Sequence, residues 1–487
     1  MAKSWATFGV DLHLEPTGTS TSTGTGIGSG TGTSAGTGSG IGTGTGVRRG
    51  LTDALRDAVR TGRLAPGTRL PSSRSLAADL GVARNTVADA YADLVAEGWL
   101  TARQGSGTRV ADRAVVPPTD TTPPRRLHTR PAYDLVPGTP DLASFPRTEW
   151  LKAARRAFTS APYQALGYGD PRGRAELRAA LAAYLARARG VRADPEHIVI
   201  SAGISNGLRL IGTALRARGA HTIAVESYGL PAHWQLLDGA GLRTRPLPFD
   251  ERGTNPEQLT DEPAVLVTPA HQFPMGLPLR HDRRSAVVDW ARRTGGLVLE
   301  DDYDGEFRYD RQPIGALQGL DPSHVVYLGT ASKSLAPGLR LAWMVLPPSL
   351  MEEVAKAKGG IDTCGVLDQL TLAEFITSGA YDRHVRAARL RYRRRRDTLV
   401  DALTHHAPDV HVTGIAAGFH AVLSLPPGTE QSVVQAAAWQ GLALHPLSSY
   451  RHAQAQADPL DALVVGYGTP PDHAWAGAVE ALCRVLP

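Results

Sequence analysis

Cysteine is nearly absent from this 487-residue sequence, which has only Cys364 and Cys483. Two cysteines at this separation match neither metal-ligand nor redox spacing, so we expect reduced thiols in a cytoplasmic protein. The sequence also lacks any run of about 18 or more apolar residues, which excludes a membrane-spanning helix. No apolar core followed by small residues occurs at the N-terminus, so we expect no signal peptide. A hydrophobic fraction of 42% and a charged fraction of 20% are typical of an ordinary globular protein.

Residues 17–46 lack almost every residue type except Thr, Gly and Ser. Such a segment buries little and loses much backbone entropy on ordering, so we expect residues 1–46 to form an N-terminal segment with a flexible insert. A second segment, VVPPTDTTPPRRLHTRP, is rich in proline and predicts an extended linker over residues 113–130. Because single cores seldom exceed roughly 250–300 residues, we expect two domains, a small one at 47–112 and a large one at 131–487.

Positive charge is concentrated in the small domain. The whole chain has a formal net charge of +5. Residues 48–110 contain ten Arg against six Asp or Glu, so this segment carries +4 of that charge. The distribution permits a nucleic-acid partner and would place it at the small domain.

The small domain has the sequence pattern of a helix-turn-helix. Apolar residues at helical spacing predict a helix over residues 48–62, which Gly62 ends. Ser72 or Ser73 can cap a second helix, which ends at Gly81. The third helix has a buried stripe made of Val87, Ala90, Tyr91, Leu94 and Val95. A short Gly-containing turn between the last two helices is the arrangement of a helix-turn-helix.

The start of the third helix supplies candidates for DNA contact. Arg84, Asn85 and Thr86 lie off the buried stripe and would face a major groove. The following WLTARQGSGTRV predicts a wing of two strands, in which the backbone at Gly105 can approach DNA closely. A protein-binding winged helix and a merely solvated Arg-rich face are the alternatives. We favour DNA because the arginines lie at element starts and at the turn, where phosphate and base contacts are made.

The segment from GRLAPGTRLPSSRSLAADLGVARNTVADAY to GSGTRV resembles the GntR-type winged helix without gaps. The resemblance implies binding to double-stranded promoter DNA, with Arg74, Arg84, Thr86 and Gly105 as contacts. That family usually has Ser where this chain has Ala83, so we expect one fewer phosphate contact here.

From residue 134 onward, apolar runs alternate with amphipathic helices, and the runs are HIVIS, TIAVE, AVLVT, GLVLED, VVYLGT and LAWMVL. Runs without polar alternation indicate strands buried on both faces, and hence a parallel α/β sheet. Ligands of such sheets bind beyond the carboxyl ends of the strands. We therefore expect the ligand site at these strand ends.

The stretch GLVLEDDYD places Asp301 and Tyr303 two positions apart at a strand end, so both point to the same face. A carboxylate behind an apolar run is costly to bury unless it meets a cation. A protonated pyridine nitrogen is such a cation, and the adjacent phenol can bond the 3-oxygen of the same ring. Taken alone, the acidic string fits a metal-binding cluster or a solvated turn better than a pyridine.

Lys333 follows the next strand and lies in a turn with Thr330 and Ser332, and Arg340 comes soon after. A lysine amine can condense with an aldehyde, while hydroxyl and guanidinium groups can hold a phosphate. A surface lysine in a Ser-rich loop is the alternative.

The stretch IVISAGISNGLRLI predicts a strand, a Gly turn and a helix, whose Gly203, Ile204 and Ser205 offer backbone N–H groups to an anion. A lysine, an acid, a phenol and two phosphate cradles on successive strand ends together predict pyridoxal 5′-phosphate (PLP) as cofactor. Lys333 is then the catalytic lysine, and no metal site is predicted.

This set and its order through residues 134–487 resemble the fold-type I aminotransferase family. The resemblance implies an α/β domain with a mostly parallel central sheet and a smaller α+β C-terminal part, beside the α+β winged helix. LGYGDPRGRAELRAAL resembles the family's N-terminal signature, which implies a homodimer in which Tyr168 reaches the phosphate of the neighbouring site. Phe273 stands where most members carry Asn. Residues 463–467 lack the family's substrate-carboxylate arginine; Arg451 is a nearby stand-in, but we favour its interpretation as a surface arginine.

Two modules in this order resemble the MocR subfamily of GntR-type regulators, which sense PLP or its adduct with an amino acid. The leading hypothesis is a DNA-binding transcription regulator with PLP, an amino acid or an amine as effector. The alternatives are an aminotransferase that carries a DNA-binding domain, with weak or vestigial transamination, and a dimerisation scaffold without PLP. The missing Asn and Arg argue against the enzyme, and the intact set around Lys333 argues against the scaffold.

Overall fold

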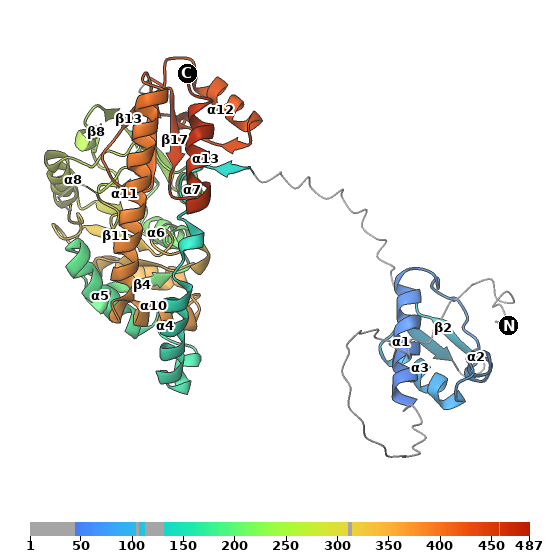
Figure 1. Cartoon of the computed structure of the whole chain (residues 1–487). Helices are drawn as coiled ribbons and strands as arrows, with labels where there is room; N and C mark the ends of the chain where they lie inside the picture. Colours follow the sequence, from blue (N-terminus) through green and yellow to red (C-terminus); the bar gives the residue numbers. More distant parts are fainter. Residues whose placement is uncertain (1–43, 104–106, 113–130, 310–313, 457) are drawn as a thin grey trace, which may run out of the picture. The chain divides into compact units, whose positions relative to one another are not determined.

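The computed structural model describes residues 44–103, 107–112, 131–309, 314–456 and 458–487. The chain divides into two compact units, Met1–His128 and Thr129–Pro487, each of which is described by itself (Figure 1). The predicted N-terminal insert up to residue 43 and the predicted linker at 113–130 lie outside the described residues. None of the described helices combines the length and apolar composition that crossing a membrane requires.

The smaller unit consists of three helices and a β-hairpin: α1 (Gly44–Arg60), α2 (Ser73–Leu80), α3 (Arg84–Ala96), β1 (Leu100–Arg103) and β2 (Gly107–Val110). The two strands pair antiparallel. The hydroxyl of Ser72 caps α2 by accepting a hydrogen bond from the amide of Ser75, and Gly81 ends the helix in the left-handed conformation. Helix α1 begins at Gly44, earlier than the predicted start. The winged helix-turn-helix expected from the sequence is confirmed.

The larger unit is built on a seven-stranded sheet with the order β4-β12-β11-β10-β9-β5-β6. Its strands are β4 (Ile198–Ser201), β5 (Thr222–Glu226), β6 (Arg243–Leu247), β9 (Ala264–Val267), β10 (Leu297–Asp301), β11 (Val325–Thr330) and β12 (Ala342–Val345). Strand β12 runs antiparallel to both neighbours, and the other neighbouring pairs are parallel. All six apolar runs form strands, which confirms the mostly parallel sheet. The sequence did not reveal β6, an edge strand that is only partly buried and has no apolar run.

Helices cover both faces of this sheet. On β10, Leu299 packs in the cluster that contains α6 (Ile204–Ala217), whereas its neighbour Val298 packs in the cluster of α8 (His281–Thr294). Because successive side chains of a strand point to opposite faces, these two helices lie on opposite sides. The other described α-helices are α4 (Arg147–Ser160), α5 (Ala175–Arg189), α7 (Pro231–Gly239), α9 (Met351–Lys358), α10 (Val366–Thr377), α11 (Ala380–His406), α12 (Glu430–Trp439) and α13 (Asp472–Cys483).

The C-terminal part is a second, antiparallel sheet packed against helices. Its strands, in spatial order, are β13 (His411–Thr413), β14 (His420–Ser424), β17 (Ala462–Gly466) and β16 (His445–Pro446). Side chains of α11, α12 and α13 share one apolar core with this sheet, in agreement with the expected α+β part. Two short pairs complete the described strands, namely β3 (Tyr133–Asp134) with β15 (Leu442–Ala443), and β7 (Phe249–Asp250) with β8 (Gly253–Thr254).

Candidate functional site

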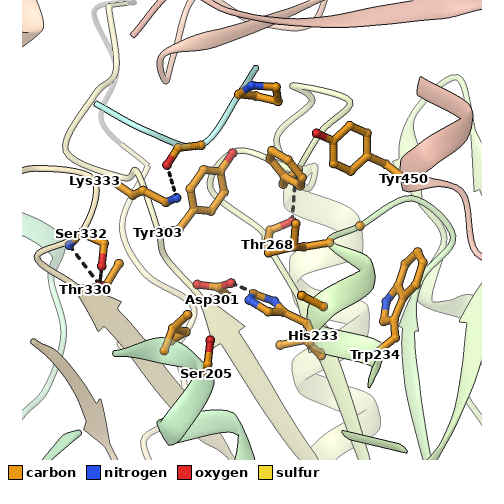
Figure 2. A pocket seen from close by; sticks show the side chains of 18 of the residues that line it. Ser205, His233, Trp234, Thr268, Asp301, Tyr303, Thr330, Ser332, Lys333 and Tyr450 are labelled. Atoms are coloured by element: carbon orange, nitrogen blue, oxygen red, sulfur yellow. Dashed lines mark hydrogen bonds and ion pairs between the residues drawn. The ribbon is translucent and has the colours of Figure 1, made fainter. Parts of the chain in front are cut away.

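A pocket lies where the parallel strands of the central sheet end. Eight of the residues predicted for a cofactor line it together: Ile204, Ser205, Asp301, Tyr303, Thr330, Ser332, Lys333 and Arg340. Asp301 and Thr330 end β10 and β11, Ile204 and Ser205 begin the helix after β4, and the other four lie in the loops after β10 and β11. The carboxyl ends of these three strands share one edge of the sheet. Figure 2 shows the side chains of Lys333, Tyr303 and Asp301 around one space.

Asp301, at the end of β10, is buried, and one of its carboxylate oxygens lacks a hydrogen-bond partner among the described residues. Its other oxygen lies 3.8 Å from Nδ1 of His233. Burial raises the pKa of Asp301 to about 7, and the nearby Lys333 opposes that rise. A buried carboxylate with an unsatisfied oxygen is costly, so the pocket is suited to a ligand that brings a cationic donor to this point.

Lys333 is half-buried in the turn after β11, and its ammonium donates a hydrogen bond to the carbonyl oxygen of Gly138. Burial lowers the pKa of Lys333, while the carboxylates of Asp301 and Asp304 oppose that change. A lowered pKa increases the fraction of neutral amine, which is the nucleophilic form.

An anion cradle adjoins the lysine. The hydroxyl of Thr330 donates to that of Ser332 at 2.9 Å and accepts the amide N–H of Ser332 at 3.1 Å. Across the pocket, Gly203 precedes α6 with a φ of 82°, and Nη2 of Arg340 donates to the carbonyl oxygen of Ala202 at 2.8 Å. Arg340 itself is the described non-glycine residue with a positive φ, 52°. A guanidinium, two hydroxyls and a helix N-terminus suit a phosphate.

The glycine at position 203 allows this close approach. A Cβ on Gly203 would lie 2.7 Å from Nη2 of Arg340, and the left-handed backbone disfavours any other residue. Gly203 is therefore part of the cradle, although its own atoms are not among those that line the pocket.

Tyr168 is the predicted cofactor residue that does not reach the pocket. It lies between α4 and α5 and is fully exposed, at 102% of its reference area. Its predicted role in the site of a second copy stays a prediction.

Residues that replace the usual aminotransferase groups are also placed by the fold. Phe273 lines the pocket, as its position in the sequence suggested. Residues 463–467 lie in or directly after β17, where Val464 is fully buried among apolar side chains. Arg451 donates to the carbonyl oxygen of Ala455 and does not line the pocket. Among the described residues that line the pocket, Arg340 is the only arginine.

Several pocket residues were not predicted from the sequence: Glu226, His233, Trp234, Thr268 and Tyr450. Glu226 ends β5, and the hydroxyls of Thr254 and Thr268 donate to it; burial raises its pKa to about 7. Burial also lowers the pKa of His233 to about 4, so this ring is neutral. Glu226 and Thr268 lie at the ends of β5 and β9. They show the same sequence pattern that located Asp301, namely a polar residue directly after an apolar run. Tyr450 comes from the distant C-terminal part and has no local signal.

The predicted DNA contacts lie at the first turns of α2 and α3. Arg74, Arg84 and Asn85 are exposed, and Thr86 is half-buried. Gly105 lies outside the described residues. Ala83, the N-cap of α3, makes no side-chain cap, so the first amides of this helix keep their positive dipole end available to a phosphate.

Ion pairs distinguish Arg48 and Arg60 of α1 from the arginines at the two helix starts. Arg48 pairs with Asp93, and Arg60 pairs with Asp57. Neither Arg74 nor Arg84 has an acidic partner among the described residues. Both guanidiniums at the helix starts are thus left for a partner, where a groove-binding surface needs them.

Comparison with known families agrees with both units. Residues 135–455 match the family described as aminotransferase class I and II, and residues 48–110 match the bacterial regulatory proteins of the gntR family. The larger unit therefore belongs to a fold family that depends on PLP, and the smaller unit belongs to a DNA-binding family.

Solved structures resemble the larger unit. A kynurenine aminotransferase of Pyrococcus horikoshii matches with a TM-score of 0.65 and 25% identity, over 74% of this chain and 91% of that chain. An archaeal alanine:glyoxylate aminotransferase matches in fold, with a TM-score of 0.66 and 24% identity over 73% and 90%.

Relatives that match both units are regulators. The pyridoxine biosynthesis transcriptional regulator PdxR of Corynebacterium glutamicum is 36% identical, over 82% of this chain and 88% of its own length. The probable rhizopine catabolism regulatory protein MocR of Rhizobium meliloti is 32% identical over 86% and 90%. The chain belongs to the MocR-type transcription regulators, in which a GntR-type winged helix is joined to an aminotransferase-like domain.

Proposed function

We propose that this regulator binds PLP through Lys333 and changes its affinity for promoter DNA according to PLP supply in the cytoplasm. The observation that carries the proposal is the unpartnered oxygen of buried Asp301, which faces the same pocket as Lys333 and the cradle at Arg340. In this proposal, residues 47–112 bind DNA and residues 131–487 bind the cofactor. Residues 113–130 form the linker between these two domains.

The donor set fits PLP group by group. Asp301 would hold the pyridine nitrogen, and the phenol of Tyr303 would hold the 3-oxygen. Thr330, Ser332 and Arg340 would hold the phosphate, with the amides of the α6 N-terminus. When bound, PLP supplies an aldehyde that bonds covalently to a lysine and a ring that can withdraw electrons. The residues themselves bind and orient the cofactor, and Asp301 keeps a proton at the ring nitrogen.

PLP itself is the effector that the pocket favours. An amino-acid adduct needs a second cation for its carboxylate, but the one arginine that lines the described pocket belongs to the phosphate cradle. The C. glutamicum relative is named as a regulator of pyridoxine biosynthesis, which agrees with such an effector. An amino acid or amine effector is the second candidate, supported by the free volume between Trp234 and Tyr450.

A second copy of the chain is expected to complete the site. The segment over α4 and the turn after it exposes five large apolar or aromatic side chains: Leu151, Phe158, Tyr163, Leu166 and Tyr168. A monomer rarely exposes so many large apolar side chains on one short segment without covering them. Their burial between two copies would bring Tyr168 toward the neighbouring phosphate cradle, as the aminotransferase resemblance implies.

An active aminotransferase is the alternative function. Lys333, Asp301 and Tyr303 suffice to bind and activate the cofactor. Phe273 and the buried Val464, which stand where polar substrate or cofactor contacts are usual, disfavour efficient turnover.

The deciding experiment begins with purified full-length protein mixed with PLP. We expect a visible absorption band that Lys333→Ala abolishes, and retention of a borohydride-reducible adduct in that variant would contradict the assignment. Genomic fragments selected by the protein then serve in DNA titrations with PLP, pyridoxine phosphate and a panel of amino acids. A change in DNA affinity of about tenfold with PLP alone supports the proposal. The same change with an amino acid only would favour the second candidate.

A further inference from the structure

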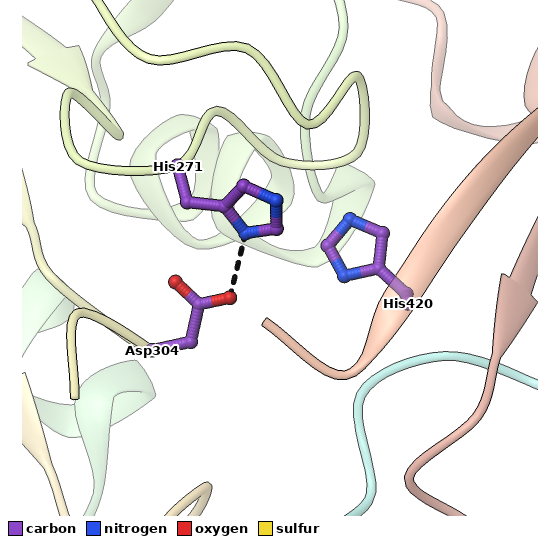
Figure 3. A group of neighbouring side chains, drawn as sticks. All are labelled: His271, Asp304 and His420. Atoms are coloured by element: carbon purple, nitrogen blue, oxygen red, sulfur yellow. Dashed lines mark hydrogen bonds and ion pairs between the residues drawn. The ribbon is translucent and has the colours of Figure 1, made fainter. Parts of the chain in front are cut away.

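Three buried polar side chains lie together behind the pocket: His271, Asp304 and His420 (Figure 3). They come from three separate parts of the larger unit, the loop after β9, the loop after β10 and the start of β14. None of the three lines the pocket itself. Any effect they have on a bound molecule therefore passes through a neighbour, and that neighbour is Tyr303.

One nitrogen of His271 faces two oxygens. Its Nδ1 lies 2.7 Å from Oδ2 of Asp304 and 3.1 Å from the hydroxyl oxygen of Tyr303. A carboxylate only accepts hydrogen bonds, so a 2.7 Å contact requires a proton on Nδ1. With Nδ1 protonated, the ring cannot accept the phenolic hydrogen of Tyr303.

We propose that Asp304 holds His271 in the Nδ1–H tautomer, so that Nδ1 cannot take the hydroxyl hydrogen of Tyr303 and this hydrogen stays available as a donor to the pocket. This inference rests on the proposed function, because the acceptor in the pocket is the 3-oxygen of PLP. Asp304 and His271 are positioning residues for Tyr303. Without the carboxylate of Asp304, Nδ1 of His271 would accept the phenolic hydrogen and withdraw it from the pocket.

The pocket depends on this donor because the residue beside it supplies no second one. Phe273, whose ring stands edge-on to Tyr303 at 5.9 Å, offers no hydrogen bond. Burial and the carboxylate of Asp304 raise the pKa of Tyr303 well above its usual value, so the phenol keeps its hydrogen at any physiological pH. The direction in which this hydrogen points is then the variable that the protein controls.

His420 packs against His271. Its Nε2 lies 3.0 Å from the carbonyl oxygen of Pro274 and therefore carries the hydrogen, while its buried Nδ1 lacks a partner among the described residues. Burial, then the neighbouring His271, lower the pKa of His420 to about 3. The centroids of the two rings lie 5.0 Å apart. His420 donates its Nε2 hydrogen to the carbonyl oxygen of Pro274, so it does not donate to Nδ1 of His271.

A metal ion is a poorer occupant of this cluster. Ligands of one tetrahedral zinc ion lie about 2.0–2.2 Å from the metal and therefore more than about 3 Å from each other. The 2.7 Å separation of His271 and Asp304 is that of a hydrogen bond.

The tautomer can be measured without any cofactor. Full-length protein labelled with 15N at its 16 histidines is examined by NMR, and the signal that disappears in His271→Gln assigns the ring. We expect the Nδ1–H pattern in the wild type and in Asp304→Asn, because an amide oxygen still accepts the bond. Asp304→Ala should switch the ring to Nε2–H. An Nε2–H ring in the wild type, an unchanged ring in Asp304→Ala, or a stoichiometric shift on adding Zn²⁺ would each overturn the proposal.

The consequence for the cofactor is measured by the pH titration of the visible band. Losing the phenolic donor should raise the apparent pKa of that band, by about one unit or more, in Asp304→Ala relative to the uncharged Asp304→Asn. In a Tyr303→Phe background this difference should vanish, because the hydrogen that the pair directs is absent. An equal difference in both backgrounds would show that Asp304 acts without Tyr303. If the wild type binds no PLP, the proposed function fails while the NMR result stands by itself.

Discussion

Asp301 bears an electrostatic cost in the pocket. It is buried, one oxygen is unpartnered among the described residues, and its neighbour His233 is neutral because burial lowers its pKa to about 4. A group whose pKa rises on folding stabilises the fold below its unfolded value, and that stability is lost as pH rises through the folded value. For Asp301 this window runs from its ordinary value of 3.8 to about 7. The ligand-free protein therefore carries an electrostatic cost at neutral pH that a cationic ligand would relieve.

The variant Asp301→Asn tests this cost. At pH 8 we expect it to increase the free energy of unfolding of the PLP-free protein by about 1–3 kcal/mol, because an unpaired buried charge is removed. At pH 4 the gain should largely disappear, since Asp301 is protonated there. PLP affinity should fall in the same variant. Thermal unfolding at both pH values and PLP titration provide the measurements, and unchanged PLP affinity would mean that another residue holds the ring nitrogen.

A second residue-scale prediction concerns Gly203. Its replacement by Ala places a Cβ 2.7 Å from Arg340 on a left-handed backbone, so we expect PLP affinity to fall by about tenfold or more. Gly190→Ala is the comparison variant, because Gly190 also has a positive φ, 69°, although with a ψ of 21° against 165° at Gly203, and an added Cβ would meet nothing within 4 Å. Equal losses of PLP affinity in the two variants would show that backbone strain, and not the cradle, is responsible.

At the scale of elements, the arginines that matter most lie on the long helix α11 and at the starts of α2 and α3. In α11, of 27 residues, the basic stretch HVRAARLRYRRRRD predicts a solvated helix face, with a secondary DNA contact as the less favoured alternative. The structure corrects this for Arg395, which is buried and bonds Asp141 at 3.0 Å and Asp472 at 2.5 Å. It also donates to the carbonyl oxygen of Tyr467. Arg395 thus joins α11 to the start of the larger unit and to α13.

The replacement Arg395→Ala should lower the free energy of unfolding by about 3–5 kcal/mol, because it leaves Asp141 buried and unpaired. Arg393→Ala, on the same helix, removes an exposed arginine 3.9 Å from Asp397 and should cost less than about 1 kcal/mol. Denaturant unfolding of both variants measures the difference. Similar losses would mean that α11 is held by apolar packing alone.

The helix starts of the smaller unit carry the DNA prediction. Arg74→Ala and Arg84→Ala should each weaken binding to selected promoter fragments and reduce its salt dependence by about 0.9 log units per decade of salt for each phosphate that the arginine neutralises. Arg60→Ala, whose guanidinium pairs with Asp57 on α1, is the control and should leave DNA binding nearly unchanged. All three variants should retain the visible PLP band. Unchanged DNA affinity in both test variants would assign the winged helix to another partner, and loss of PLP would mean that the domain boundary is misplaced.

At the scale of the whole molecule, the exposed apolar segment at Leu151–Tyr168 predicts a dimer. Sedimentation of the PLP-saturated protein should give twice the chain mass of 51.7 kDa. Tyr168→Ala should lower PLP affinity although Tyr168 does not line the pocket of its own chain. Trp439→Ala, which removes an exposed ring of α12 outside this segment, serves as the control and should leave PLP affinity unchanged. A PLP-saturated monomer would contradict this assembly directly.

Local patterns were sufficient for much of this protein. Six buried strands, the capping of α2 by Ser72 and the strand-end positions of Asp301, Tyr303 and Lys333 follow from apolar runs and their neighbours. The chemistry of the pocket was predictable for the same reason, because parallel strands deliver their carboxyl ends to one edge. Edge strand β6 was not predictable from the sequence, because a partly buried strand has no apolar run.

The tertiary structure alone decided which distant groups meet. Gly138 and Tyr450, from the two ends of the larger unit, reach the same pocket as Lys333, and nothing near either residue signals this. The contact of His271 with Asp304 joins loops that follow different strands, and His420 arrives from the second sheet. Sequence periodicity reports which face of an element is buried, whereas burial of a polar atom and the identity of its partner depend on how the elements pack. For this reason the sequence predicted Lys333 and Asp301 but did not predict the proposed positioning of the Tyr303 hydroxyl by Asp304 and His271.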